Sequence, residues 1–174
     1  MDQVRKKEYE GFRKMELLVD SGAAASVLPE RLLEDYSVIQ GDAAKKGVHY
    51  LTADGGRVPN LGEMKVRLLT KEQHRTSVTF QVADIQKPIL SVGALAASGH
   101  EVSFTKWGGT ITIAKSKKKI AFKKRGGVYV LEVLVAPGDN RSATADGRGP
   151  ARRSATADAP RGAQAPGFTR QGTK

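Results

Sequence analysis

The stretch that decides the fold is MELLVDSGAAASVLPERL, which runs from Met15 to Leu32. Its apolar start predicts a short strand over Met15–Val19, which ends directly at a carboxylate, Asp20, followed by Ser21, Gly22 and three alanines. Small residues allow a sharp turn and the close approach of another backbone segment. An acid at the end of an apolar strand lies at the rim of a core, where a carboxylate that activates water must lie. Asp20 is therefore a candidate catalytic residue, and the simpler interpretation is a turn that Asp20 caps.

The chain beyond this stretch, as far as Val135, is typical of a small, mainly β domain. Short segments alternate apolar and polar residues between Gly-rich or Lys-rich turns, which indicates strands, whereas Ala23–Leu33 and Val92–Ala97 favour a turn or a brief helix. The expected strands cover residues 48–53, 63–69, 77–82, 89–90, 100–104, 110–114, 119–122 and 128–133. Many short strands with one or two short helices favour a barrel-like or sandwich architecture.

Composition divides the chain into three segments. Residues 1–14 are mostly charged, residues 15–137 form the expected domain, and residues 138–174 form a basic tail rich in Ala, Gly, Pro, Arg, Ser and Thr. The tail contains RSATAD twice, at Arg141–Asp146 and Arg153–Asp158. It lacks the apolar surface that would offset the entropy lost on ordering, so we expect it to be disordered.

The chain has a net charge of +11 and no cysteine. The absence of cysteine excludes disulfides and thiolate metal sites, and it fits a reducing, cytoplasmic compartment. We expect neither a signal peptide nor a membrane partner, because no stretch is apolar enough. The densest basic run, Lys115–Arg125, indicates a solvated hairpin face, with weak nonspecific contact to RNA or another polyanion as the alternative. No stacking aromatic platform accompanies this run in the sequence, so recognition of particular bases is not expected.

Several enzyme classes lack their sequence signals. His49, His74 and His100 are far apart, and none has the neighbour spacing of a metal site. Phosphate-binding glycine loops, the nucleophile elbow and the zinc-peptidase motif do not occur. We therefore expect no metal and no cofactor. Peptide hydrolysis by carboxylates uses two carboxyl groups that share one proton, and the chain contains only one Asp-Ser/Thr-Gly string.

The string VDSGA, Val19–Ala23, resembles the active-site signature of the retropepsins, the aspartic proteases of retroviral type, which carry one such motif per chain and act as homodimers. Two further blocks follow in order. TADGGRVPNLGEMKV, at 52–66, resembles the flap hairpin of retrotransposon proteases. FQVADIQKPILSVGALAASGHEVSF, at 80–104, resembles the second hydrophobic segment and helix, in a form closest to copia-type retrotransposons. The resemblance covers about residues 15–135.

The resemblance implies a small closed, barrel-like acid-protease domain that hydrolyses peptide bonds, with a peptide or polyprotein as substrate. Asp20 would be the catalytic acid, paired with Asp20 of a second chain in a symmetric homodimer, and the two acids would titrate as a coupled pair. Ser21, Gly22 and Ala23 would support the catalytic loops where they meet. The flap and substrate-binding residues would be Ala53, Asp54, Gly55, Gly56, Arg57 and Val58.

The sequence leaves alternatives for both fold and function. Retropepsins have strands ahead of the catalytic motif, and here residues 1–14 either replace those strands or leave that part of the fold missing. Val128–Val135 is apolar enough to serve as an interface strand. The other functions are an inactive retropepsin-like fold that acts as a dimerisation or binding module, and a basic polyanion-binding protein. The intact Asp20-Ser21-Gly22 string favours the protease, because no structural role demands an acid there.

Overall fold

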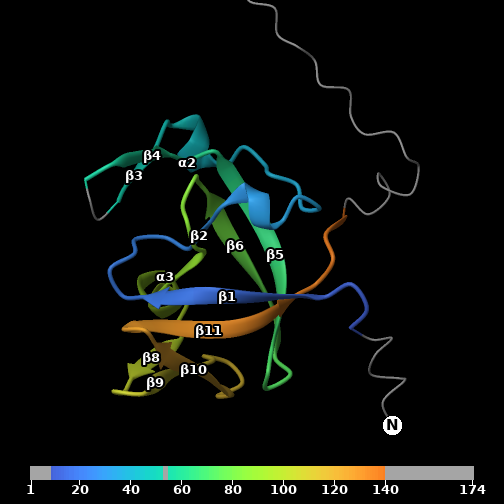
Figure 1. Ribbon diagram of the computed structural model, residues 1–174, viewed down its shortest axis with the longest axis vertical. Helices are drawn as coiled ribbons and strands as arrows, with labels where there is room; N and C mark the ends of the chain where they lie inside the picture. Colours follow the sequence, from blue (N-terminus) through green and yellow to red (C-terminus); the bar gives the residue numbers. More distant parts are fainter. Residues whose placement is uncertain (1–8, 53–54, 140–174) are drawn as a thin grey trace, which may run out of the picture.

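The computed structural model describes residues 9–52 and 55–139 (Figure 1). Outside the described residues lie 1–8 of the charged N-terminal segment, Ala53 and Asp54 of the expected flap, and 140–174 of the expected tail. The described chain is mainly β with short helices, which confirms the fold class expected from the alternating pattern. In chain order the elements are β1 (Arg13–Asp20), β2 (Val27–Leu28), the 3-10 helix η1 (Glu30–Leu32), α2 (Asp42–Lys45), β3 (His49–Leu51), β4 (Arg57–Pro59), β5 (Gly62–Thr70), β6 (Arg75–Val82), β7 (Ile89–Ser91), α3 (Val92–Ala97), β8 (Glu101–Phe104), β9 (Gly108–Thr112), β10 (Lys119–Arg125) and β11 (Val128–Val135).

Nine strands of the described chain form one sheet, in the order β1-β7-β2-β6-β5-β11-β10-β9-β8. β1 also pairs with β11, so the pairings of the first six strands return to their starting point, and β10, β9 and β8 extend from β11. The pairs β1–β7 and β2–β6 are parallel, and the others are antiparallel. β3 and β4 form a separate hairpin, which extends to the same side of the molecule as the Asp20 end of β1 (Figure 1).

β5 and β6 form the longest hairpin and supply much of the core. Met64 and Val66 in β5 and Phe80 and Val82 in β6 are fully buried, because alternate residues of a strand point to the same face. The charged residues between Met64 and Leu68 point to solvent. This buried face packs in the same cluster as Leu17 of β1 and so supports the strand that ends at Asp20.

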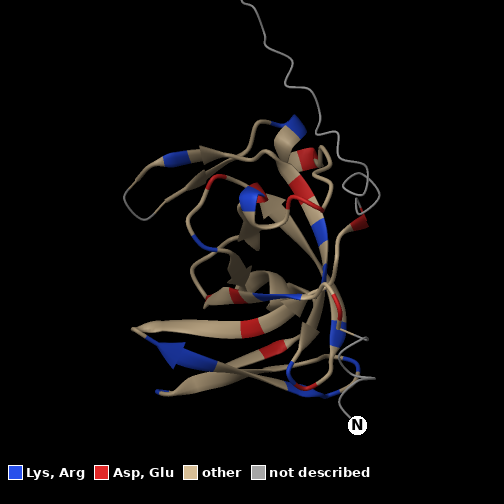
Figure 2. Cartoon of the chain, turned by 45° about the vertical axis from the view of Figure 1, so that its right-hand side comes forward, with Lys and Arg blue, Asp and Glu red and all other residues tan. Residues whose placement is uncertain are grey.

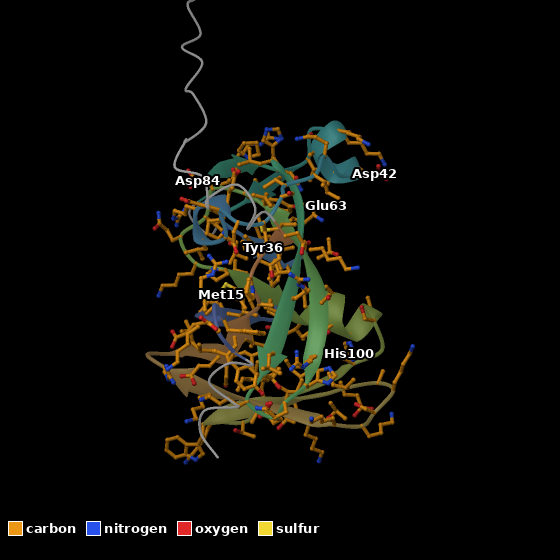
Figure 3. The ribbon with its side chains drawn as sticks, turned by 90° about the vertical axis from the view of Figure 1, so that its right-hand side faces the viewer. Met15, Tyr36, Asp42, Glu63, Asp84 and His100 are labelled. Carbon is orange, nitrogen blue, oxygen red and sulfur yellow. The ribbon has the colours of Figure 1, made fainter. Side chains whose placement is uncertain are left out.

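Tyr36 and its neighbour Asp35 fasten the segment after η1 to both ends of the described domain (Figure 3). The Tyr36 ring is buried in the core, and its hydroxyl donates to the carbonyl oxygen of Ala136 at 2.8 Å. The Asp35 carboxylate accepts the Gly138 N–H at 2.7 Å and forms an ion pair with Arg13 at the start of β1. These contacts link the start of β1 and the residues just after β11 to one short segment.

Val128–Val135, whose apolar character suggested an interface strand, is paired along both edges within its own chain. As β11, it pairs along one edge with β1 and along the other with β10 and β5. The register runs from Arg13 opposite Val135 to Leu18 opposite Val130. The antiparallel partner of the strand that carries Asp20 therefore comes from the C-terminal side of the domain, whereas Tyr9–Gly11, ahead of β1, form a turn.

Most of the expected strands are present with shifted ends. The strand expected at 110–114 lies at Gly108–Thr112, and the one expected at 48–53 is shorter, at His49–Leu51. The brief helix expected over Val92–Ala97 is confirmed as α3. The region 23–33, expected to be a turn or brief helix, contains both η1 and the unexpected two-residue strand β2, and α2 was not expected at all.

Candidate active site

Asp20 is the last residue of β1 and is partly buried at the rim of the core. The parallel strand β7 lies beside it, with Ser91 in register with Asp20. The N–H of Gly22 donates to Asp20 Oδ1 at 2.7 Å, and in the described part of the chain this is the only hydrogen bond to that carboxylate. One oxygen is thus fixed by the loop, and the other is left for water or a ligand.

The loop after Asp20 is held by two buried serines. The Ser91 hydroxyl donates to the carbonyl oxygen of Ala23 at 2.6 Å and accepts the N–H of Ala94 at 3.1 Å. It therefore both caps α3 and holds the loop after Asp20. Ser26 Oγ accepts the N–H of Ser91 at 3.0 Å. Because both serines are buried, these bonds are shielded from water and position the carboxylate at the start of the loop.

A depression of about 370 Å³ opens beside Asp20. Asp20 and Ser21 line it together with residues at the ends of β8 and β11, namely Phe104, Val128 and Tyr129. Phe104 and Tyr129 are in edge-to-face contact, with ring centroids 4.8 Å apart. The acid therefore faces an open site with one apolar wall and not a closed core.

The two residues after Asp20 are exposed and have few ties to their own chain. Among the described residues, none forms a hydrogen bond with the Ser21 hydroxyl. A Cβ atom on Gly22 would approach only Asp20 Oδ1, at 3.4 Å, and the φ angle of Gly22 is not in the left-handed region. The chain bends at Ser21 and Gly22, but this bend uses neither a left-handed φ angle nor a close contact that only glycine would allow.

The expected flap residues that the structure describes lie in the β3–β4 hairpin. Gly55 adopts a φ angle of +84°, and its N–H donates to the Thr52 carbonyl at 2.9 Å, while Arg57 and Val58 belong to β4. The base is anchored by Asn60, whose Nδ2 donates to Tyr50 Oη at 2.8 Å and to Gln81 Oε1 at 2.7 Å. The depression beside Asp20 is lined by Asp20 and Ser21 but by none of the described hairpin residues, 49–52 and 55–59.

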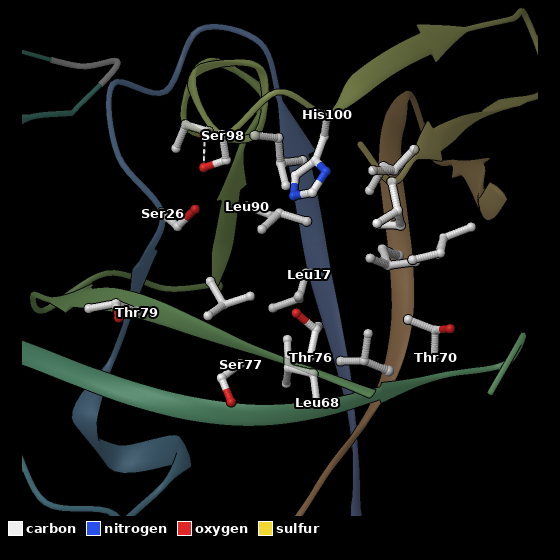
Figure 4. Close-up of a pocket in the computed structure, with 18 of the residues that line it drawn as sticks. Leu17, Ser26, Leu68, Thr70, Thr76, Ser77, Thr79, Leu90, Ser98 and His100 are labelled. Carbon is white, nitrogen blue, oxygen red and sulfur yellow. Dashed lines mark hydrogen bonds between the residues drawn. The ribbon is translucent and has the colours of Figure 1, made fainter. Parts of the chain in front are cut away.

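A second cavity of about 370 Å³ lies behind β1 (Figure 4). It is lined by apolar residues such as Leu17 and Leu90 and by polar ones that include Ser98 and His100. The His100 Nδ1 accepts the N–H of Ala114 at 3.1 Å. Asp20 does not line this cavity, because it is three residues from Leu17 and so points to the opposite face of β1.

The carboxylates with displaced pKa values lie away from Asp20. Burial raises the pKa of Asp35, but hydrogen bonds from Gly138 and Arg13 outweigh it, so the pKa is lowered overall. Hydrogen bonds from Lys71 and Arg125 lower the pKa of Glu132 to about 2. These groups stabilise the sheet and are not candidates for catalysis.

Within residues 9–52 and 55–139, no group of three His, Asp or Glu side chains could hold a metal ion. No helix in that part of the chain has the length and apolar character needed to cross a membrane.

No protein-family model matches the chain, and no curated protein sequence matches it.

Sequence reasoning missed the residues that build the surroundings of Asp20. Ser91 precedes a helical stretch, which is the usual signal for a helix cap and could have been recognised. Phe104, Val128 and Tyr129 come from strands that lie more than eighty residues from Asp20 in the chain, and no local pattern connects them with it.

Proposed function

We propose that this protein is an aspartic endopeptidase of retropepsin type, active as a homodimer in which Asp20 of each chain acts on one peptide bond. The observation that carries the proposal is the position of Asp20, at the end of a core strand, with one carboxylate oxygen held by the Gly22 N–H and an open depression beside it. Within the described residues, the Gly22 N–H is the one hydrogen-bond donor to this carboxylate.

The exposed loop supports a second copy as the partner. A single carboxylate cannot serve as both base and acid, so the reaction needs another acid close by. Ser21 and Gly22 are exposed, the Ser21 hydroxyl has no described partner, and Gly22 leaves room beside the carboxylate. Two such loops related by a two-fold axis would bring the two Asp20 side chains together.

In the dimer the two Asp20 side chains would share one proton, because two carboxylates in contact do not both ionise. The ionised one takes a proton from water as the water attacks the peptide carbonyl, and the protonated one donates to the carbonyl oxygen. The β3–β4 hairpin would close over the substrate, and Leu51, which is 76% exposed, offers an apolar contact for it.

The proposed fold is the closed, barrel-like form of the acid proteases. The pairings that return to β1 through β11 support it, as does the parallel β7 followed directly by α3. In this arrangement β11 takes the place of the strand that in retropepsins precedes the catalytic motif.

The test is digestion of a peptide library by the purified chain at mildly acidic and neutral pH, with products identified by mass spectrometry. Asp20→Asn should abolish cleavage while the oligomeric state and thermal unfolding stay unchanged, because it removes the charge and little volume. Asp42→Asn is the matched control, since Asp42 lies on the surface in α2, and it should cleave normally. Cleavage that survives Asp20→Asn would overturn the proposal, as would a chain that remains monomeric yet cleaves.

A further inference from the structure

Trp107 is an exposed aromatic residue on a rigid turn. Its side chain is 76% exposed, although the burial of an indole is normally favourable. The turn is fixed by Thr105, whose N–H donates to the Gly108 carbonyl at 2.7 Å and whose Oγ1 accepts the Gly108 N–H at 3.2 Å. Gly108 packs closely on β10, because a Cβ atom there would lie 2.2 Å from the Phe122 carbonyl oxygen. The fold therefore presents this indole to solvent in a defined position.

Three lysines lie near the turn that carries the indole, one through its side chain and two through the backbone of β10. Lys106 Nζ lies 4.6 Å from the Trp107 ring centroid, and the N–H of Lys124 donates to the Trp107 carbonyl at 2.9 Å. Lys123 is in register with Gly108, next to Trp107 along the chain. Figure 2 shows the resulting block of positive charge at the end of β10. The exposed indole thus lies beside the basic run, for which the sequence suggested no stacking aromatic platform.

No acid of the described residues neutralises these lysines, and the Lys124 ammonium lies 5.4 Å from the centroid of the Tyr129 ring. The nearby acids, Glu16 and Glu132, are paired with Arg125, and Glu132 also with Lys71. In the described part of the chain, no ion pair involves the three lysines beside Trp107. Their positive charge is therefore available to a ligand.

We propose that Trp107 with Lys106, Lys123 and Lys124 forms a binding site for single-stranded nucleic acid. A base stacks on the exposed indole, and the three ammonium groups contact the flanking phosphates. A single strand fits better than a duplex, whose bases are already stacked and cannot reach an indole on a turn. A second copy of this chain is a less suitable partner for the site, because its lysines would repel these lysines. The site is separate from peptide cleavage and does not depend on it.

The chain offers a direct readout, because Trp107 is its only tryptophan. The full-length protein is titrated with an oligothymidylate of about a dozen nucleotides while the intrinsic fluorescence is followed. Stacking should quench the emission. Heparin, polyglutamate and the matching duplex provide negative charge without accessible bases and should quench it much less. Equal quenching by heparin or polyglutamate would overturn the proposal, because the site would then recognise charge alone.

The variants are measured by the fluorescence anisotropy of a labelled oligonucleotide. Trp107→Ala should weaken binding about 5- to 100-fold, the range expected when one stacked base is lost, and Trp107→Phe should restore part of it. Because the side chain is exposed, both variants should keep the wild-type melting temperature. Unchanged affinity in Trp107→Ala would overturn the proposal.

Charge removal is tested with a matched pair of double variants. Lys123→Ala with Lys124→Ala should weaken binding and reduce the slope of log affinity against log salt by about 1.4, since each phosphate contact to a single strand contributes about 0.7. Lys45→Ala with Lys46→Ala removes the same charge from the region of α2 and should leave the slope unchanged. Equal effects of the two pairs would show binding through overall charge, including the basic segment after residue 139, and would overturn the site.

Discussion

Gly22 lies two positions after the candidate catalytic acid, and its own chain gives no reason for a glycine there. Its φ angle is not left-handed, and a Cβ atom would meet only Asp20 Oδ1, at 3.4 Å. Gly108, by contrast, is required by its own chain, because a Cβ atom there would collide with the Phe122 carbonyl oxygen. A glycine required only by an approaching second loop should be dispensable for the fold and necessary for the dimer.

We therefore predict that Gly22→Leu keeps the fold but loses dimerisation and cleavage. Its free energy of unfolding, measured on the monomer in urea, should change by about 0.5 kcal/mol or less, as is usual for exposed positions. Sedimentation should show a monomer, and peptide cleavage should fall sharply. Gly108→Ala should instead lower stability. A Gly22→Leu protein that dimerises and cleaves normally would contradict the proposed contact between the loops.

Ser91 carries the second prediction at the scale of single residues. Its buried hydroxyl bonds to both the Ala23 carbonyl and the Ala94 N–H, so Ser91→Ala leaves two polar groups without a partner. The expected loss is about 2 kcal/mol of unfolding free energy, measured by urea denaturation. The control Ser98→Ala removes an exposed hydroxyl that bonds to the Ala94 carbonyl, and it should cost about 0.5 kcal/mol or less. Equal losses of unfolding free energy in both variants would show that the two hydrogen bonds of the Ser91 hydroxyl do not stabilise the fold more than an exposed one does.

Among the elements, the β3–β4 hairpin depends on one buried side chain. Asn60 donates to Tyr50 Oη and Gln81 Oε1, and its Oδ1 accepts the Gly62 N–H at 2.8 Å. Within the described residues the hairpin pairs with no strand of the main sheet, and its base is tied to β6 by the Asn60 side chain and by the Leu61 N–H, which donates to the Val82 carbonyl at 2.8 Å.

Asn60→Ala should therefore loosen the hairpin more than the domain. Hydrogen exchange should become faster at the amides of residues 49–51 and 57–59, whereas the amides shared by β5 and β6 should keep their protection. Tyr50→Phe removes only one of the three bonds and should give a smaller effect. Uniformly faster exchange across the sheet would mean that Asn60 supports the whole fold and not this element.

The elements also show which features the sequence could predict. β5 and β6 alternate clearly, with Val66 and Phe80 on the buried face, and both were expected close to their observed bounds. The strand expected at 110–114 begins earlier, at Gly108 and Gly109, where the Phe122 ring and backbone leave no room for side chains. β2 has only two residues, which is too short for any period to be visible.

At the scale of the whole molecule, the pairing of β1 with β11 decides how the fold is completed. The sequence showed that both segments were strands but could not show that they pair, because Leu18 and Val130 are more than a hundred residues apart. The Asp20 motif could be recognised locally. The apolar residues beside it, Phe104, Val128 and Tyr129, could not be recognised from the sequence, because only the tertiary fold brings the ends of β8 and β11 next to β1.

The ion pairs of β1 and β11 predict how the stability of the molecule depends on pH. Asp35 ties β1 to the segment after β11, and the Gly138 N–H and Arg13 hold its pKa below its ordinary value. Glu132 on β11 pairs with Lys71 and Arg125, and its pKa falls from 4.5 to about 2. For both groups the unfolded chain binds protons more readily than the folded one, so their contribution is complete above about pH 5 and is lost as the pH falls through the folded pKa values.

The urea midpoint, measured at one protein concentration from neutral pH down to about pH 2, should therefore fall steadily below about pH 5. Glu132→Gln should lower the midpoint at neutral pH and flatten the part of the curve below pH 4.5, because its amide has no proton to gain there. Glu101→Gln, on the outer edge strand β8, is the matched control and should leave the shape of the curve unchanged. A Glu132→Gln protein that keeps the full acid dependence would show that the closure between β11 and its neighbours does not rest on this ion pair.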